Sequence, residues 1–233
     1  MTLESNVGNT YGARTERELE ALWALETSIA GIAAQFKGEN AFNYSQEVEI
    51  ASYLMVSLRE TFGAIEQVGS LSVHLSRMEW RCLPGRSIDL VLIQPDSARS
   101  AREGWGKGRS KVAKTIPLLA AVQIKRGAGN VTPLSQVRKD LRDLDQIMTS
   151  ANLGRPVAYF LAWIDSVLRQ RPHQSERYLT VKDELREWCD GSPEHRRAFF
   201  LSRDRVGFAF PSGAWLVRPI PPGTTESTPF IKS

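Results

Sequence analysis

The sequence predicts an α/β fold with a central mixed sheet flanked by helices. Apolar residues recur at helical spacing in two segments before residue 64, and short β-prone runs dominate from there to about residue 125. Helical and strand patterns then alternate up to residue 202. The core order is α, β, β, β, α, β, with an extra helix at the N-terminal side. Helices and strands in this order bury their apolar faces when helices pack on a sheet.

Two helices are expected before the first strand. Thr15 and Glu18 form a capping box at the start of the first helix, which runs to about Gly38. Its apolar stripe consists of Leu22, Leu25, Ile29, Ile32 and Phe36. The second helix opens near residues 43–45 and ends near Gly63. Its stripe consists of Ile50, Leu54, Leu58 and Phe62.

Four strands are expected in the central part of the chain. The segments 71–80 and 88–93 are separated by Leu83-Pro84-Gly85-Arg86, which is typical of a hairpin turn. A third strand, Leu118 to Lys125, follows a long polar insertion. Val157 to Ile164 is a continuous apolar run, which is typical of a central strand covered on both faces.

The remaining elements are two helices and a last strand. The apolar spacing of residues 134–148 predicts a helix after the third strand. Thr180 and Asp183 predict the start of a further helix, and Ala198 to Ser202 is expected to be the last core strand.

Length and composition favour one intracellular domain. The 233 residues suit a single domain over residues 15–220, with loose polar tails at 1–14 and 221–233. A net charge of +4 permits nucleic-acid binding without requiring it. Two cysteines make no disulfide framework, and no apolar run approaches the roughly 18 residues of a membrane span. We therefore expect a cytoplasmic protein without a membrane partner.

Two polar residues share one face of the third strand. Gln123 and Lys125 are two positions apart and project together, whereas Val122 and Ile124 point the opposite way into packing. Burying an amide and an ammonium without partners would cost a few kcal/mol. Asp89, in the neighbouring hairpin strand, is the expected partner.

These residues offer a set of ligands that contains only oxygen. The carboxylate of Asp89, the side-chain carbonyl of Gln123 and the main-chain carbonyl of Ile124 suit Mg²⁺ or Mn²⁺ better than zinc. Lys125 beside such an ion could orient or help deprotonate a water and offset charge on a phosphate. Phosphodiester hydrolysis requires this combination.

The stretches RSIDLVLI and AAVQIKRG, preceded by a Glu-bearing helix and followed by a helix and a strand, resemble the PD-(D/E)XK superfamily. The resemblance covers the chain from about Asn43 to Ser202 and implies a restriction-endonuclease-like core and a metal-dependent nuclease that cleaves DNA. The aspartate of that family corresponds to Asp89 and its lysine to Lys125. Gln123 stands where the family usually has Glu.

The resemblance also implies a glutamate on the helix before the hairpin, directed toward the metal site. Glu47 fits this role best, and Glu49 is the alternative. Ser87-Ile88 stands where the family name would place a proline before the aspartate, a change common in these proteins.

A basic segment lies between the strands that carry the expected site. Residues 99–114 contain six basic residues and one acid, with three glycines around Trp105. This segment could grip a phosphate backbone while Trp105 stacks on a base, and a flexible solvated loop is the equal alternative. The candidate DNA-binding residues are Arg102, Trp105, Lys107, Arg109, Lys111, Lys114 and Arg126.

The polar side of the helix after the third strand could extend this basic surface. Arg138, Lys139 and Arg142 are candidates for secondary contacts with DNA. The more common explanation is a solvated face on which they pair with Asp140 and Asp143.

Three functions are therefore weighed. The first is a Mg²⁺-dependent DNA endonuclease, with a role in bacterial defence or mobile-element processing implied by the resemblance. The second is a nuclease-like domain that has lost catalysis and binds nucleic acid or a protein partner, because Gln123 removes one negative charge. The third is an unrelated α/β domain in which Asp89 and Lys125 form a structural ion pair. A homodimer or a partner in a larger complex is left open.

Overall fold

Six strands form one mixed sheet in the order in which they occur along the chain. The computed structural model describes residues 14–35, 47–64, 76–83, 86–97, 116–127, 132–164, 172–202 and 206–211. The strands are β1 (Ser76–Leu83), β2 (Arg86–Ile93), β3 (Leu118–Arg126), β4 (Val157–Ile164), β5 (Arg196–Ser202) and β6 (Val206–Phe210). The pairs β3/β4 and β4/β5 are parallel, and the other neighbours are antiparallel. The predicted mixed sheet is confirmed.

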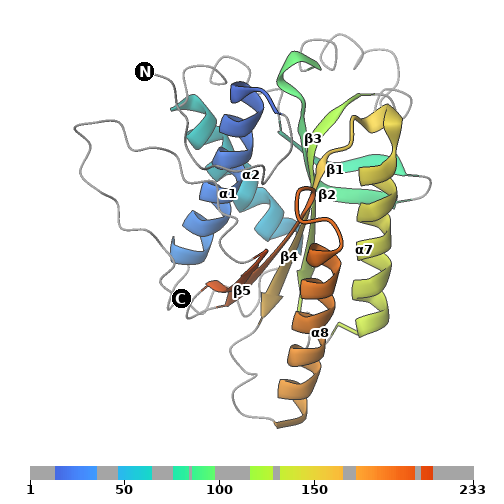
Figure 1. Cartoon of the computed structure of the whole chain (residues 1–233). Helices are drawn as coiled ribbons and strands as arrows, with labels where there is room; N and C mark the ends of the chain where they lie inside the picture. The colour runs from blue at the N-terminus through green and yellow to red at the C-terminus, as the bar shows by residue number, and fades with distance from the viewer. Residues whose placement is uncertain are drawn as a thin grey trace, which may run out of the picture.

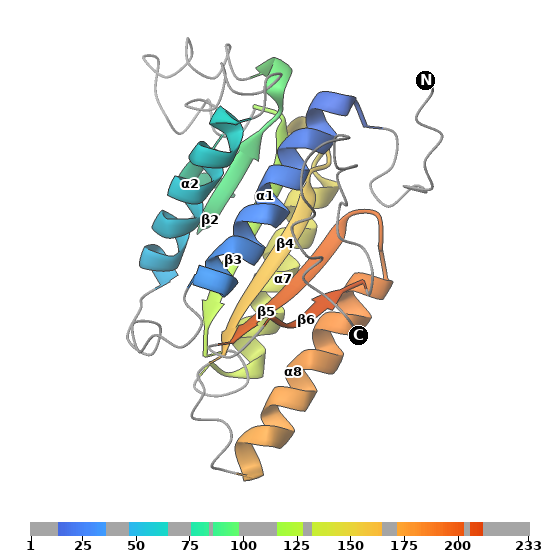
Figure 2. The same cartoon turned by 90° about the vertical axis from the view of Figure 1, so that its left-hand side faces the viewer.

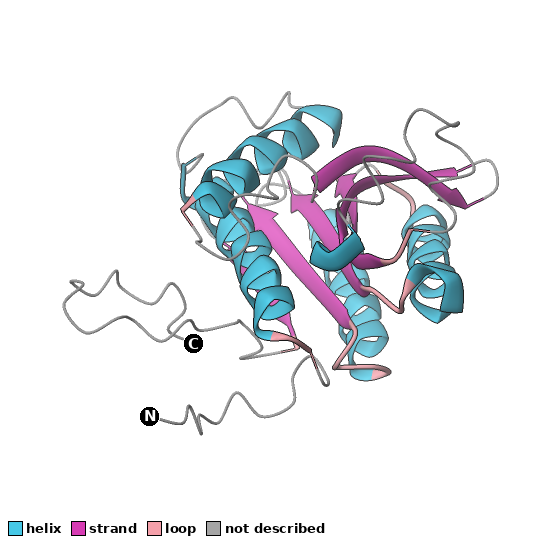
Figure 3. Cartoon of the chain, turned by 90° about the horizontal axis from the view of Figure 1, so that it is seen from above, coloured by secondary structure: helices cyan, strands magenta, loops and turns pink. Residues whose placement is uncertain are grey.

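In the part of the chain that the structure describes, four helices cover the two faces of this sheet. They are α1 (Glu16–Gln35), α2 (Glu47–Gly63), α7 (Leu134–Thr149) and α8 (Pro172–Asp190), with short 3-10 turns η2 (Pro95–Ser97) and η4 (Ala151–Leu153). Helices α1 and α2 lie on one side of the sheet and α7 and α8 on the other (Figure 1). Figure 3 shows the same layers from above. The predicted arrangement of helices around the sheet is therefore confirmed.

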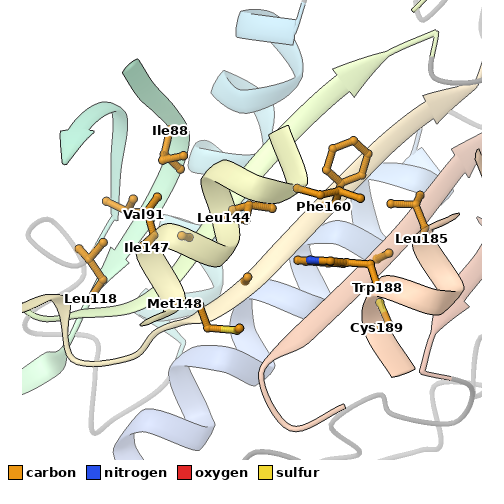
Figure 4. Packing of buried hydrophobic residues seen from close by; sticks show 14 of the residues in the cluster. Ile88, Val91, Leu118, Leu144, Ile147, Met148, Phe160, Leu185, Trp188 and Cys189 are labelled. Carbon is orange, nitrogen blue, oxygen red and sulfur yellow. The ribbon is translucent and has the colours of Figure 1, made fainter. Parts of the chain in front are cut away.

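Strand β4 is covered on both faces, as its apolar run predicts. Tyr159 and Leu161 belong to the apolar cluster formed with α1 and α2, which lie over the sheet in Figure 2. Phe160 and Ala162 belong to the cluster formed with α7 and α8. Figure 4 shows Phe160 in this second cluster with side chains of α7 and α8 around it. Alternation along one strand thus joins both halves of the core.

The capping box at the start of α1 is confirmed. The main-chain N–H of Thr15 donates to Glu18 Oε2 at 2.9 Å, and the N–H of Glu18 donates to Thr15 Oγ1 at 3.3 Å. Both cysteines, Cys82 and Cys189, are buried and neither forms a disulfide bond in the described ranges. No helix in the described ranges is long and apolar enough to cross a membrane. The predicted tails, 1–14 and 221–233, fall outside those ranges apart from Arg14.

Two predictions near the C-terminal end are wrong. Helix α8 begins at Pro172, so Thr180 lies inside it and does not cap it. The Thr180 hydroxyl donates back to the carbonyl of Glu176 at 2.8 Å, which satisfies it within the helix. Strand β5, which includes Ala198 to Ser202, is followed by β6, which pairs antiparallel with it. The strand at Ala198 to Ser202 is therefore not the last strand of the sheet.

A buried hydrogen bond links α1 to the central strand. The Tyr159 hydroxyl donates to Glu26 Oε1 at 3.0 Å, and both side chains are buried. Burial, followed by the nearby charge of Glu26, raises the pKa of Tyr159 well above its ordinary value. The Tyr159 ring also stacks on Phe199 of β5 with a centroid distance of 6.0 Å. This polar contact fixes the position of α1 against the sheet.

Replacing Tyr159 with Phe tests this contact. The Tyr159→Phe variant removes the phenol donor from Glu26 but keeps the stacked ring, so the free energy of unfolding should fall by about 1–3 kcal/mol. Chemical denaturation measures the change. The control is Tyr53→Phe, at a tyrosine that is 49% exposed, where a change within about 0.5 kcal/mol is expected. Equal stabilities of the two variants would contradict a structural role for the Tyr159 hydroxyl.

Candidate active site

The site begins where β2 separates from β3. The antiparallel ladder between these strands ends at Leu90 and Val122. Continuation of the same register would bring Ile88 opposite Ile124. Instead, the N–H of Ile124 donates to Asp89 Oδ2 at 2.6 Å. A side-chain carboxylate therefore takes the place of a main-chain acceptor at the end of β3.

Gln123 meets the same carboxylate. Its side chain is 8% exposed, and its amide Nε2 donates to Asp89 Oδ2 at 2.7 Å. Val122 and Ile124, on either side of it in sequence, are buried in the cluster formed with α1 and α2. The predicted alternation along β3 is confirmed, and Asp89 is in contact with Gln123 as expected.

Lys125 lies between two carboxylates from different helices. Its Nζ is 3.3 Å from both carboxylate oxygens of Glu47 at the start of α2 and 3.3 Å from Asp140 Oδ2 in α7. The lysine side chain is 13% exposed. Burial lowers the pKa of Lys125, but attraction to Asp140 and Glu47 and the hydrogen bond to Glu47 outweigh burial, so the pKa is raised overall. The ammonium is therefore held in its charged form.

Glu47 also accepts a hydrogen bond from the backbone at the end of β3. Its Oε1 accepts a hydrogen bond from the N–H of Arg126 at 3.0 Å. Glu49, the alternative in the same helical turn, is exposed. Of the two glutamates weighed from the sequence, Glu47 is thus the one that contacts Lys125.

Asp140 is the member of this cluster that sequence reasoning missed. The sequence predicts a solvated helix face for it, but Asp140 and Asp143 are each only 6% exposed. Arg138, the expected partner of these acids, instead binds Glu184 of α8, with its Nη2 2.8 Å from Oε2. The available signal is that position 140 follows Val137 by three residues and therefore belongs to the apolar stripe of α7.

A second polar side chain holds Asp140. The amide Nε2 of Gln136, one helical turn earlier, donates to Asp140 Oδ1 at 2.7 Å. The other oxygen, Oδ2, is the one that lies next to Lys125. The two oxygens of this carboxylate are therefore directed to different partners.

The predicted DNA contacts are only partly described. Arg126 follows Lys125 at the end of β3 and is half-buried. The basic segment lies outside the described residues, and it includes Arg102, Trp105, Lys107, Arg109, Lys111 and Lys114.

A hard cation at this point would meet one carboxylate and neutral oxygens, so it would keep most of its water ligands. Within the described ranges, no three His, Cys, Asp or Glu side chains form a group that could hold a metal ion. Asp89 and Gln123 are in contact, and the N–H of Ile124 points to Asp89. In an extended strand, the N–H and C=O of one residue point to the same edge, so the Ile124 carbonyl lies on that side too. Mg²⁺ is commonly bound by this few protein ligands.

The cradle of Lys125, meaning the carboxylates of Glu47 and Asp140 around its ammonium, can be tested by its effect on stability. Lys125→Met removes the cation from beside the buried Asp140, so the free energy of unfolding should fall by about 2 kcal/mol, between the values for exposed and buried pairs. Adding Asp140→Asn should restore part of this loss. The stabilisation should be complete below pH 10.5, the ordinary pKa of lysine, and fade as the pH rises through the raised pKa. Urea denaturation of both variants at neutral and alkaline pH checks this. The pairing would be contradicted if Asp140→Asn added a further loss of its own instead of restoring part of the first.

Comparison with known proteins gives no relative for this arrangement. No family model, no curated protein and no solved structure matches the chain.

Proposed function

We propose that the chain is a Mg²⁺- or Mn²⁺-dependent nuclease that hydrolyses DNA phosphodiester bonds. One observation carries the proposal. Asp89 and Gln123, on neighbouring strands, are in contact at the end of β3, and Lys125 follows two positions later in a cradle of carboxylates. Oxygen ligands beside a held ammonium suit the transfer of a phosphoryl group to water.

Each residue of the site has a distinct role in this proposal. Asp89, Gln123 and the main-chain carbonyl of Ile124 would hold the ion. The bound ion would polarise the phosphate and lower the pKa of the attacking water. Lys125 orients that water and offsets the negative charge that develops on the phosphate. Glu47 is assigned mainly to Lys125, because both of its oxygens lie within hydrogen-bonding or ion-pair distance of Lys125 Nζ or the N–H of Arg126.

The order of elements supports a restriction-endonuclease-like core. Helix α2, the strands β1, β2 and β3, helix α7 and strand β4 follow in the order α, β, β, β, α, β. The site residues fall on the elements that the resemblance implies: Glu47 on the helix, Asp89 on β2, and Gln123 and Lys125 on β3. Helix α1 is then the addition before this core. A role in bacterial defence or mobile-element processing stays a prediction of the resemblance, and a cytoplasmic location stays a prediction of the composition.

One observation favours the second candidate, a nuclease-like domain that binds nucleic acid or a protein partner without cutting. Gln123 is neutral, and its amide N–H faces Asp89 at 2.7 Å, so this pair is satisfied without a cation. A measurement of cleavage separates the two candidates.

The proposed activity is tested on supercoiled plasmid DNA with Mg²⁺ or Mn²⁺. The wild-type protein should nick or linearise the plasmid, and Asp89→Ala and Lys125→Ala should each lose about 100-fold or more in rate. Lys182→Ala, which alters a lysine of α8, is the matched control and should cleave as the wild type does. Gel electrophoresis measures the products, and binding of the same DNA is measured in parallel.

The outcomes separate the candidate functions. Cleavage that persists in Asp89→Ala and Lys125→Ala would place the active site elsewhere. Binding of DNA without cleavage by any of the proteins would favour the non-catalytic domain. If the wild-type protein neither binds nor cleaves the DNA, the assignment to nucleic acid is overturned.

Replacing Gln123 with Glu tests whether this position faces a cation. In Gln123→Glu, a second carboxylate replaces the amide that donates to Asp89, so the metal-free protein should have a lower melting temperature. Adding Mn²⁺ should raise that temperature by more than it does for the wild type, because binding to the folded state stabilises it. Thermal denaturation with and without Mn²⁺ measures both effects. The same Mn²⁺ response in both proteins would argue that Gln123 is not a ligand.

A further inference from the structure

We infer that Asp140 is a positioning residue for Lys125, fixing the ammonium over the site from α7. This inference rests on the proposed nuclease function and adds to it a residue that neither the motif nor the resemblance includes. The contacts that support it run from Gln136 through Asp140 to Lys125.

Two carboxylates are needed to hold a lysine in one place. The ammonium of lysine ends a flexible four-carbon chain, and a single partner leaves that chain free to rotate about it. Glu47 approaches Nζ from the first turn of α2, and Asp140 approaches it from α7, each at 3.3 Å. Because α2 and α7 pack on opposite faces of the sheet, Nζ is restrained from two directions.

The orientation of Asp140 assigns it to Lys125 and not to a cation. Its Oδ1 accepts from Gln136 at 2.7 Å, which turns Oδ2 toward Lys125. The contacts of Asp89 are instead with Gln123 and the N–H of Ile124 on β3. In the part of the chain that the structure describes, no third acid joins these groups to make a metal cluster. Asp140 therefore acts through the lysine.

The burial of Asp140 is costly without such a role. An acid that is 6% exposed on the apolar stripe of α7 carries a desolvation penalty. Exchanging a buried ion pair for packed apolar side chains is often neutral or stabilising, so stability alone gives little reason for a carboxylate here. A fixed position of Lys125 Nζ supplies that reason.

The test compares Asp140→Asn with Asp145→Asn. Asn at 140 keeps the shape and an acceptor for Gln136 but loses the charge, so kcat for plasmid cleavage should fall about 10- to 100-fold, as expected for a displaced catalytic group. KM for DNA should stay within about twofold, because Asp140 is assigned no contact with substrate. Asp145 is an acid of the same helix that binds Trp188 and Arg196 instead, so Asp145→Asn should keep the wild-type kcat.

A second variant protects the test against misfolding. Gln136→Ala leaves the carboxylate in place but removes the hydrogen bond that orients it, so kcat should fall by a smaller factor, about 3- to 10-fold, without a change in KM. Circular dichroism and the melting temperature establish that each variant is folded. If kcat falls in proportion to the melting temperature in all the variants, Asp145→Asn included, the loss reflects stability and the positioning role is overturned.

A readout that does not depend on cleavage completes the experiment. Limited labelling with an amine-reactive ester, followed by mass spectrometry, reports how readily the uncharged amine of Lys125 becomes available to the reagent, which requires release from its carboxylate partners. Labelling of Lys125 should rise several-fold in Asp140→Asn and stay unchanged in Asp145→Asn. Unchanged labelling together with wild-type kcat in Asp140→Asn would refute the inference and leave the nuclease intact. An inert wild-type protein would instead refute the proposed function, and the labelling would still decide whether Asp140 holds Lys125.

Discussion

The end of β3 imposes one requirement on the surrounding structure: its main-chain donors need acceptors after β2 has separated from it. The N–H groups of Ile124 and Arg126 are bound by the carboxylates of Asp89 and Glu47, at 2.6 and 3.0 Å. An unsatisfied donor in such a place costs about 1–3 kcal/mol, so both acids have a structural reason to be there. Because each acid is tied to the backbone of the same strand, their relative placement follows from the geometry of β3.

The layers of the fold bring the remaining groups to this point. Strand β3 pairs in parallel with β4 and packs between α2 and α7, so side chains from both helices can reach its end. Glu47 comes from the first turn of one helix and Asp140 from the middle of the other. Lys125 is the residue they share. A site held by strand backbone and packed helices has its geometry set before any ligand arrives.

Local patterns in the sequence were enough to predict the strand-borne half of the site. Alternation along β3 places Gln123 and Lys125 on one face, and the hairpin places Asp89 next to Gln123. Asp140 is missed because a single acid at the edge of an apolar stripe can be either buried or exposed. Its burial depends on which face of the sheet α7 packs against, and the local sequence does not give that. The start of α8 was misplaced because a Thr hydroxyl can either cap a helix or bond back four residues within it. The separation of β2 from β3 depends on pairing between distant residues, which no local pattern encodes.

The two side-chain acceptors at the end of β3 give the protein built-in spectroscopic probes. An amide proton in a regular β-ladder is bonded to a main-chain carbonyl of the neighbouring strand. Those of Ile124 and Arg126 are bonded instead to carboxylates of the site. Any change in charge at Asp89 or Glu47 alters the polarisation of these two N–H bonds directly. Their nuclear magnetic resonance frequencies therefore report separately on the two acids, one beside Gln123 and the other beside Lys125, without any label being added to the chain.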